Sequence, residues 1–304
     1  NLSASRVNID DVNWIADENN SSLKDSVSDT ESQSSSQLSK RNSRVGKDAP
    51  PPEGENSNMY LGNISNASTT QPDNFLLDQG YYISSYNKTK AIPNWVSWHL
   101  DKRNISGKSG RRNNFAADIA LPSEWYQVQS NSYSGSGFDR GHNCPSGDRT
   151  SSAMANSSTF LMTNMIPQAP ENNQKIWSDF EVYIRNQIGK GNEAYIVMGV
   201  YGSGGYGAKA KRVNSIDGGK IAVPARIWKV AVILPEGADA LTRIPEFARI
   251  IAIDTPNENL IRPNWKSYIT SIDDIEKATG YDILKNLPLN FQDEIEQTKY
   301  LIKP

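Results

Sequence analysis

The chain of 304 residues has one cysteine, Cys144, and two histidines, His99 and His142. A single cysteine excludes an intrachain disulfide, so the packed core must hold the fold, and the redox compartment stays open. No run of about 18 apolar residues is present, which excludes a transmembrane helix. The chain shows no signal peptide and begins at Asn1 rather than at a methionine, which suggests a processed or truncated start.

Positive charge is also scarce, because Lys and Arg number 32 against 34 Asp and Glu, a net charge of −2. This balance is unusual for a protein that binds nucleic acid, but it is uneven along the chain. Residues 1–58 carry six basic and ten acidic side chains, which leaves 26 basic and 24 acidic side chains in the remainder. The remainder therefore has a net charge of +2, and a basic cleft within it could still bind phosphate.

The first part of the chain, residues 1–58, is rich in Ser, Asn and Asp and contains one aromatic residue, Trp14. Such a segment buries too little apolar surface to offset the conformational entropy that it would lose on ordering. We therefore predict a low-complexity polar tail over residues 1–58 and one folded domain over residues 59–304.

The folded part combines short β-like runs with a few helical segments. The clearest helix follows Pro170 and extends to about Ile188, because Ile or Phe recurs every four residues along it. Further helices are expected from Ser271 to Gly280, where Asp274 completes a capping-box pattern, and over residues 291–299. Strands are expected at residues 95–100, 159–165, 194–200, 221–224, 227–234 and 249–253. Because strands and helices do not alternate regularly, we predict an α+β fold with an antiparallel central sheet flanked by helices.

The chemistry-bearing stretch is SGSGFDRGHNCPSGDRTSS, in which Arg140 precedes His142 by two residues. An expected strand and helix follow, and the helix carries Asn173 in its first turn and then Glu181 and Arg185. Phosphodiester hydrolysis requires a base for the attacking water, positive charge for the transition state, help for the leaving oxygen and substrate positioning. A neutral imidazole, an arginine and an oxygen-ligated divalent cation supply the first three.

The run DRGH, followed by NMIPQAPENNQ, resembles the signature of the DNA/RNA non-specific endonucleases of the ββα-metal superfamily, in particular the NucA-like secreted nucleases. Further blocks in the family's order are LGNISNAS, NWVSWHL and RRNNF upstream and AYIVMG and WKVAVIL downstream. Several ordered blocks in one chain are far more specific than a four-letter motif. The resemblance covers roughly residues 59–290 and implies that the active site is a strand–loop–strand–helix ββα-metal finger.

The resemblance also implies the roles of the reacting groups. His142 would deprotonate the attacking water, Asn173 would bind the metal directly, and Glu181 would orient a metal-bound water. The geometry of a regular helix agrees with this division, because eight residues rise roughly 12 Å and their two side chains cannot both reach one metal. A single amide ligand suits Mg²⁺, with Mn²⁺ as an alternative, since these hard ions retain water and accept phosphate oxygens.

Substrate binding would fall to the arginines. The resemblance implies that Arg140 and Arg111 contact the phosphate and that Arg185 lies at the rim of the cleft, whereas Arg112 is expected to face solvent. Asp139 is expected to act as a scaffold that fixes Arg140, because an additional carboxylate at the substrate would repel phosphate.

Several residues have a structural alternative. Asn173 could simply cap the first turn of its helix, and Glu181 with Arg185 could be an ordinary i,i+4 surface pair. His99 is expected to serve packing or a hydrogen bond. Cys144 is expected to be a bystander, since no second histidine is placed to activate it.

A glycine-rich run, residues 202–207, formally matches G-x-G-x-x-G after a strand. No helix is expected after it, so a glycine hairpin is favoured over a dinucleotide site. The neighbouring Lys209, Lys211 and Arg212 could touch a nucleic-acid backbone.

The sequence thus predicts a phosphodiester hydrolase that cuts DNA and RNA, single- and double-stranded, to 5′-phosphate ends in a secreted or extracytoplasmic location. No helix-turn-helix, zinc-finger spacing or RNP-like aromatic pair is present that would read bases. Two alternatives stay open: a nuclease effector delivered to competitors and accompanied by a proteinaceous inhibitor, and a non-catalytic nucleic-acid-binding protein. The oligomeric state is also open.

Overall fold

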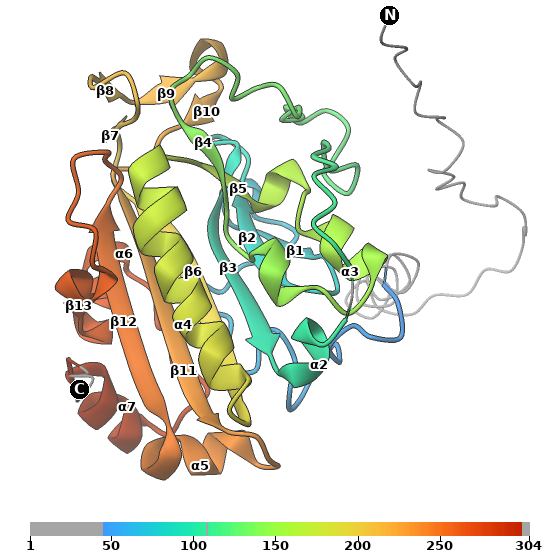
Figure 1. Cartoon of the computed structure of the whole chain (residues 1–304), viewed down its shortest axis with the longest axis vertical. Coiled ribbons are helices and arrows are strands. Elements are labelled where there is room, and N and C mark those ends of the chain that lie inside the picture. The colour runs from blue at the N-terminus through green and yellow to red at the C-terminus, as the bar shows by residue number, and fades with distance from the viewer. Residues whose placement is uncertain (1–44, 108, 300–304) are drawn as a thin grey trace, which may run out of the picture. The chain divides into compact units, whose positions relative to one another are not determined.

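A computed structural model describes residues 45–107 and 109–299 of the chain. At its centre lies a seven-stranded antiparallel sheet with the strand order β1-β2-β3-β6-β11-β12-β13 (Figure 1). Its strands are β1 (Phe75–Asp78), β2 (Ile83–Asn87), β3 (Ile92–Leu100), β6 (Asn192–Tyr201), β11 (Arg226–Pro235), β12 (Arg249–Pro256) and β13 (Ile269–Thr270). The predicted α+β fold with a central antiparallel sheet is confirmed.

A hydrophobic core covers each face of the sheet. Alternate side chains of the central strands point to opposite faces and so contribute to different cores. On β11, Ile227 and Ala231 belong to one hydrophobic core, and Trp228 and Val230 belong to the other. The first core includes the buried side of α4 (Ser178–Ile188), which crosses the sheet in front of β6 and β11 in Figure 1. The second core includes α5 (Ala240–Phe247) and α6 (Ile272–Thr279) and is contacted by α7 (Leu289–Glu296).

Shorter elements fill the loops between these parts. They are η2 (Pro72–Asn74), α2 (Lys102–Ile105), β4 (Asp139–His142), η3 (Ser146–Asp148), α3 (Ala153–Ser158), η4 (Met162–Asn164), β5 (Met165–Gln168), η5 (Asn172–Trp177), β7 (Gly205–Tyr206), β8 (Arg212–Val213), β9 (Ser215–Ile216), η6 (Asp217–Gly219), β10 (Ile221–Ala222) and η7 (Trp265–Tyr268). No helix in the described ranges is long and apolar enough to cross a membrane.

The expected strand over residues 159–165 is wrong. The segment instead passes through the 3-10 helix η4, and β5 starts only at Met165. Asn164 explains the difference, since its side-chain amide donates to the carbonyls of Cys144 and Thr159 and its Oδ1 accepts from the Cys144 backbone N–H. These bonds replace the partners that a strand neighbour would have supplied. The expected strand over residues 221–224 is reduced to the two residues of β10.

The helix after Pro170 is present and ends before Gly189, as expected, but its first part is not a regular α-helix. Residues Asn172–Trp177 form a π-helix, and α4 begins at Ser178. The assumption of a regular rise between Asn173 and Glu181 is therefore wrong. The helix at Ser271 is also present, with Ser271 Oγ accepting from the Asp274 backbone N–H and Gly280 at its C-cap.

Part of the predicted tail contacts the domain. The Gly46 backbone N–H donates to the Tyr81 hydroxyl over 2.9 Å, and Asn58 is buried with its Nδ2 donating to the Gly80 carbonyl over 2.9 Å. Asn58 Oδ1 also accepts from the His99 backbone N–H over 3.2 Å. Residues 1–44 of the predicted tail lie outside the described residues.

Candidate active site

A two-stranded hairpin followed by a helix presents the DRGH motif. Strands β4 and β5 pair antiparallel, with Gly141 opposite Ile166 and His142 opposite Met165, and the π-helix and α4 follow. Gly141 is required here because a Cβ at this position would lie 2.5 Å from Gln168 Cβ. That close approach lets Gln168 Nε2 donate to Asn172 Oδ1 over 2.8 Å, which ties the hairpin to the start of the helix.

The imidazole of His142 is nearly buried, with 9% of the residue exposed. Its ring packs edge-to-face on Phe160 and Phe115, with centroids 5.0 and 5.7 Å away. Burial and the positive charges of Arg111 and Arg140 together lower the pKa of His142 to about 3, against an opposing hydrogen bond to the Arg140 backbone. Its Nε2 has no hydrogen-bond partner within the described ranges. The ring is therefore neutral at neutral pH, and its Nε2 is a buried nitrogen that no group of the described residues engages.

Two arginines share the aromatic platform that supports His142. The Arg140 guanidinium lies 3.6 Å from the Phe115 centroid, and that of Arg111 lies 5.0 Å from the Phe160 centroid. The two rings contact each other edge-to-face at 4.9 Å. Neither phenylalanine was assigned a role from the sequence. Phe115 lies in the block RRNNF beside Arg111, whereas Phe160 lies 20 residues from Arg140, so no local spacing indicates its contact with a guanidinium.

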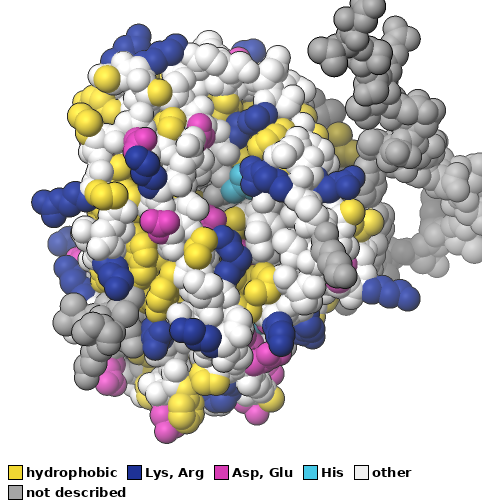
Figure 2. Space-filling view, in the orientation of Figure 1, with side chains coloured by type: hydrophobic (Ala, Val, Ile, Leu, Met, Phe, Trp, Pro, Cys, Tyr) yellow, Lys and Arg dark blue, Asp and Glu magenta, His cyan; other side chains and the backbone are white. Residues whose placement is uncertain are grey.

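Hydrogen bonds fix the direction of each guanidinium. Arg140 Nη1 donates to the Ser130 carbonyl over 2.8 Å, and Arg111 Nη1 donates to Ser146 Oγ over 2.9 Å. Both arginines line an open cleft, whose other residues include Phe115, Asp139, Asn173 and Gln174. Figure 2 shows a histidine side chain beside Lys and Arg side chains on one face of the molecule. The cleft thus has a basic rim, and the imidazole of His142 packs on Phe115, one of the residues that line it.

Asn173 and Asp139 meet at this cleft from the helix and the first strand of the hairpin. Asn173 Nδ2 donates to Asp139 Oδ2 over 2.9 Å, and Gln174 Nε2 donates to the same oxygen over 2.8 Å. Asp139 therefore orients Asn173 rather than Arg140, which differs from the expected scaffold role. With its nitrogen bonded to Asp139, the amide of Asn173 leaves its oxygen as the atom that could bind a cation.

Glu181 and Arg185 belong to a buried group of four charges beside the cleft. Arg185 Nη1 lies 2.8 Å from Asp148 Oδ1 and 3.8 Å from Glu181 Oε2, and Lys229 Nζ lies 3.4 Å from Glu181 Oε1. Burial raises the pKa of Glu181, while the positive charges of Lys229 and Arg185 oppose the rise. The alternative of an ordinary surface pair is wrong, because the glutamate side chain is only 14% exposed and has a second cationic partner.

Sequence reasoning missed Asp148 and Lys229. Lys229 is fully buried, with its ammonium 4.8 Å from the Trp177 centroid and 5.4 Å from the Trp98 centroid. Trp98 Nε1 in turn donates to Asp148 Oδ2 over 3.0 Å. A lone lysine in the otherwise apolar run WKVAVIL was the available signal, because a charge on a central strand requires a buried partner.

The remaining candidates lie away from the cleft or take a structural role. His99 Nε2 lies 3.1 Å from Glu193 Oε2 inside the fold. Cys144 is buried, which raises the pKa of its thiol to about 12 and keeps it unreactive. The glycine-rich run leads into the β7–β8 hairpin without a helix, and its Lys209 Nζ donates to the Gly135 carbonyl.

Comparison with known proteins identifies the family. The family model for DNA/RNA non-specific endonucleases matches residues 61–290. A nuclease of Nostoc sp. is 42% identical over 240 residues, which covers 78% of this chain and 84% of the relative. The mitochondrial nuclease EXOG of Homo sapiens is 30% identical over 201 residues, which covers 64% of this chain and 53% of the relative.

A solved structure shares the fold. A chain in the crystal structure of the EndoG/EndoGI complex superimposes on this chain with a TM-score of 0.61 at 21% sequence identity. That structure addresses the mechanism of EndoG inhibition. The match covers 76% of this chain and 91% of that chain. The chain therefore belongs to the DNA/RNA non-specific endonuclease family and is an enzyme that hydrolyses nucleic acid.

Proposed function

We propose that the enzyme cleaves DNA and RNA by a metal-dependent mechanism in which His142 takes the proton from the attacking water. The state of His142 carries this proposal. Its imidazole is neutral, its Nε2 has no partner within the described part of the chain, and the positive charges of Arg111 and Arg140 act on it. A neutral ring nitrogen beside two phosphate-binding cations can accept a proton from a water next to the bound phosphorus.

Substrate binding would strengthen His142 as a base. The positive charges of Arg111 and Arg140 lower its pKa in the free enzyme. A phosphate bound between these guanidinium groups would offset their charge and raise the proton affinity of the imidazole. The base would thus be strongest when the phosphodiester is in place, and the arginines would then face the negative charge of the transition state.

Asn173 is the residue that we assign to the metal. Its amide nitrogen is held by Asp139, so Oδ1 is the atom left to bind a hard cation such as Mg²⁺ or Mn²⁺. When bound, such an ion supplies Lewis-acid stabilisation to the phosphate and the leaving oxygen. Glu181, held by Lys229 and Arg185, would orient water in the outer shell of the ion.

The products and partners follow from the same assignment. Attack of water on phosphorus would leave 5′-phosphate ends on single- and double-stranded DNA and RNA, since the proposed contacts are to phosphate rather than to sugar or base. We include a proteinaceous inhibitor of the cleft, because EndoG, which shares this fold, is inhibited in its complex with EndoGI. A secreted or extracytoplasmic location and an effector role both stay predictions, and several of the relatives are named as mitochondrial.

Cleavage of supercoiled plasmid and of RNA, titrated with Mg²⁺ and Mn²⁺, tests the proposal. We expect EDTA to abolish cleavage and Asn173→Ala to lose activity that added metal supports. We expect His142→Ala to cut about 10²–10⁴-fold more slowly while it binds DNA as the wild type does in fluorescence anisotropy. Cleavage in the presence of EDTA would contradict the metal dependence of the mechanism. Near-wild-type cleavage by His142→Ala would contradict the role of His142 as the base.

A further inference from the structure

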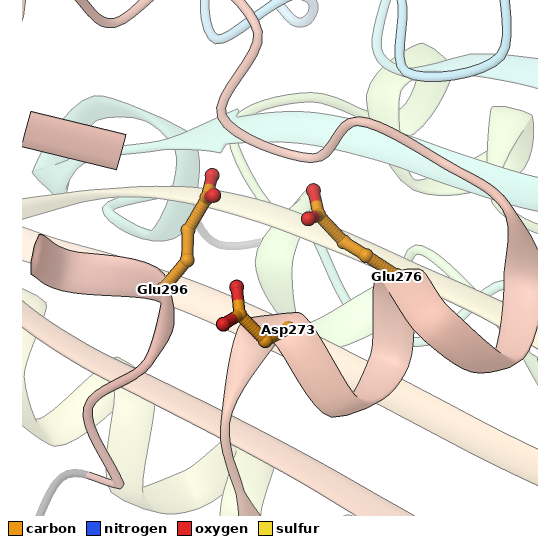
Figure 3. Close-up of side chains that lie close together, drawn as sticks. All are labelled: Asp273, Glu276 and Glu296. Atoms are coloured by element: carbon orange, nitrogen blue, oxygen red, sulfur yellow. The ribbon is translucent and has the colours of Figure 1, made fainter. Parts of the chain in front are cut away.

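Three carboxylates meet on the face of the sheet opposite α4. Asp273 and Glu276 lie one helical turn apart on α6, and Glu296 is the last residue of α7. One oxygen of each lies within 4.8 Å of the other two, and the three side chains face a common space between the helices (Figure 3). Asp273 is exposed, Glu276 is partly buried and Glu296 is 6% exposed.

Glu296 is the unusual member of this group. Its Oε1 is buried and has no hydrogen-bond partner within residues 45–107 and 109–299. A buried carboxylate oxygen without a partner is costly in free energy, and the C-terminal end of α7 adds the negative end of a helix dipole. A carboxylate with an unpartnered buried oxygen, in a space shared with two further carboxylates, indicates that a positively charged ligand belongs there.

The surrounding charges make this need larger. Burial, together with the negative charges of Glu276, Asp273, Asp282 and Asp293, raises the pKa of Glu296 to about 7, and all four of these neighbours are acidic. A lysine is close, but Lys299 Nζ lies 3.4 Å from Asp274 Oδ2 and serves that carboxylate instead.

The donor set selects the class of ligand. Glu276 Oε1 accepts from the Ile283 backbone N–H over 2.6 Å, so its other oxygen is free to face Glu296. Carboxylate oxygens are ligands for hard divalent cations. Ca²⁺ accepts several carboxylates in a flexible geometry, whereas Mg²⁺ keeps most of its waters and usually takes one or two carboxylates. Three carboxylates with oxygens within 4.8 Å of one another therefore suit Ca²⁺ better than Mg²⁺.

We propose that Asp273, Glu276 and Glu296 form a Ca²⁺-binding site that joins α7 to α6, with water completing the coordination on the exposed side of Asp273. The site is separate from the cleft, since α6 and α7 pack on the core that lies across the sheet from α4. Its role is to hold the C-terminal helix on the domain.

Thermal unfolding and isothermal titration calorimetry with Ca²⁺ test the site on the full chain after EDTA treatment and dialysis. Asn173→Ala serves as the background, because it removes the cation ligand assigned in the cleft and so separates the two sites. In this background we expect Ca²⁺ to bind and to raise the melting temperature by roughly 2–4 °C when its concentration is well above the Kd.

Glu296→Gln in the same background keeps the shape of the side chain and removes its charge. We expect it to weaken Ca²⁺ binding at least tenfold and to abolish the thermal shift, with Asp273→Asn giving a smaller loss. The control is Glu294→Gln, which changes an exposed glutamate of the same helix and should bind Ca²⁺ as the background does.

Three results would overturn the proposal: no Ca²⁺ binding at millimolar concentration in the Asn173→Ala background, an unchanged Kd in both Glu296→Gln and Asp273→Asn, or equal stabilisation by Mg²⁺. The last would contradict the choice of Ca²⁺. None of these readouts depends on nuclease activity, so failure here is distinguishable from failure of the proposed mechanism.

Discussion

Lys229 Nζ lies 3.4 Å from Glu181 Oε1, and this ion pair joins the central sheet to the helix beside the cleft. The lysine side chain is fully buried and that of the glutamate is 14% exposed. The pair forms because the alternation of β11 turns Lys229 toward the same core as α4. The ammonium favours the ionised form of Glu181, which is the form that the proposed mechanism requires.

Lys229→Met tests the catalytic consequence of this pair. Methionine keeps most of the side-chain volume but removes the charge, so burial should then raise the pKa of Glu181 without opposition from Lys229. We expect about 10–100-fold weaker activity at low Mg²⁺, with partial recovery at high Mg²⁺, as for loss of a group that supports a metal-bound water.

The matched control is Lys190→Met, which alters an exposed lysine just beyond the C-terminal end of α4 and should change neither activity nor metal dependence. Measurement of rate against Mg²⁺ concentration separates the outcomes. If Lys229→Met lowers the melting temperature but leaves the Mg²⁺ dependence of the folded enzyme unchanged, the lysine has only a structural role.

The pH dependence follows from the low pKa of His142. Because this pKa is about 3 in the folded enzyme, the acid limb of kcat/KM should lie well below the ordinary histidine value of about 6.5. The unfolded chain protonates His142 near 6.5, so its contribution to the free energy of unfolding should fall as the pH drops from about 6.5 toward 3.

Nuclear magnetic resonance measures this titration directly, because the chain has only two histidines. The imidazole signals of His142, assigned by their absence in His142→Ala, should not shift between pH 5 and pH 8. A midpoint near 6.5 would contradict the burial and charge that the structure gives this ring.

The sequence predicted the long apolar strands well, and it predicted the polar ones poorly. Strands β6 and β11 alternate apolar residues that fill both cores, and such runs are readable from composition. Strand β2 was missed because Ser84 and Ser85 are buried polar residues, and Ser85 Oγ donates to Asn74 Oδ1 over 2.7 Å. Partners that lie elsewhere in the chain cannot be read from a local pattern.

The candidate site shows the same division. The roles predicted for His142 and Asn173 came from the family resemblance of the motif and the helix that follows it. It could not identify Lys229, which the register of β11 against β6 and the position of α4 bring to Glu181 across 48 residues. The π-helical start of the helix was also beyond the sequence, because a four-residue apolar repeat does not distinguish it from a regular helix.

Truncation of the N-terminus tests whether the folded domain begins at residue 59, as the composition predicts, or includes residues before it. Removal of residues 1–44 should leave catalysis on short substrates nearly unchanged, since no residue assigned to the mechanism lies there. Removal of residues 1–58 should lower the melting temperature, because it also deletes the hydrogen bonds of Asn58 to Gly80 and His99.

Asn58→Ala in the shorter truncation is the matched variant, and it should reproduce part of the loss. Thermal unfolding of the three proteins provides the comparison. If the two truncated proteins have equal melting temperatures, residues 45–58 do not stabilise the domain, and the domain begins at residue 59.

Cleavage without sequence preference is expected from the kind of contact that the cleft offers. Arg140 stacks on Phe115 and Arg111 on Phe160, so both guanidinium groups are fixed by rings and by protein hydrogen bonds. Groups held in this way suit phosphate, which every nucleotide carries. Affinity should therefore fall as salt rises through counterion release, while cut positions stay scattered along any duplex.

Arg140→Ala should slow the cutting of every sequence, in DNA and in RNA, by a similar factor, because a phosphate contact carries no base information. Arg112→Ala is the control: its neighbour Arg111 lies over the Phe160 ring and lines the cleft, whereas Arg112 is not among the lining residues and should be dispensable. Sequencing the ends of partial digests, with rates measured on substrates of defined sequence, gives the comparison. A sharp consensus at the cut sites of the wild type, or a loss in Arg140→Ala that is confined to particular sequences, would mean that Arg140 reads bases. If the enzyme positions its substrate through phosphate alone, Arg140→Ala should lower the cleavage rate of all substrates equally. Arg112→Ala should not lower it.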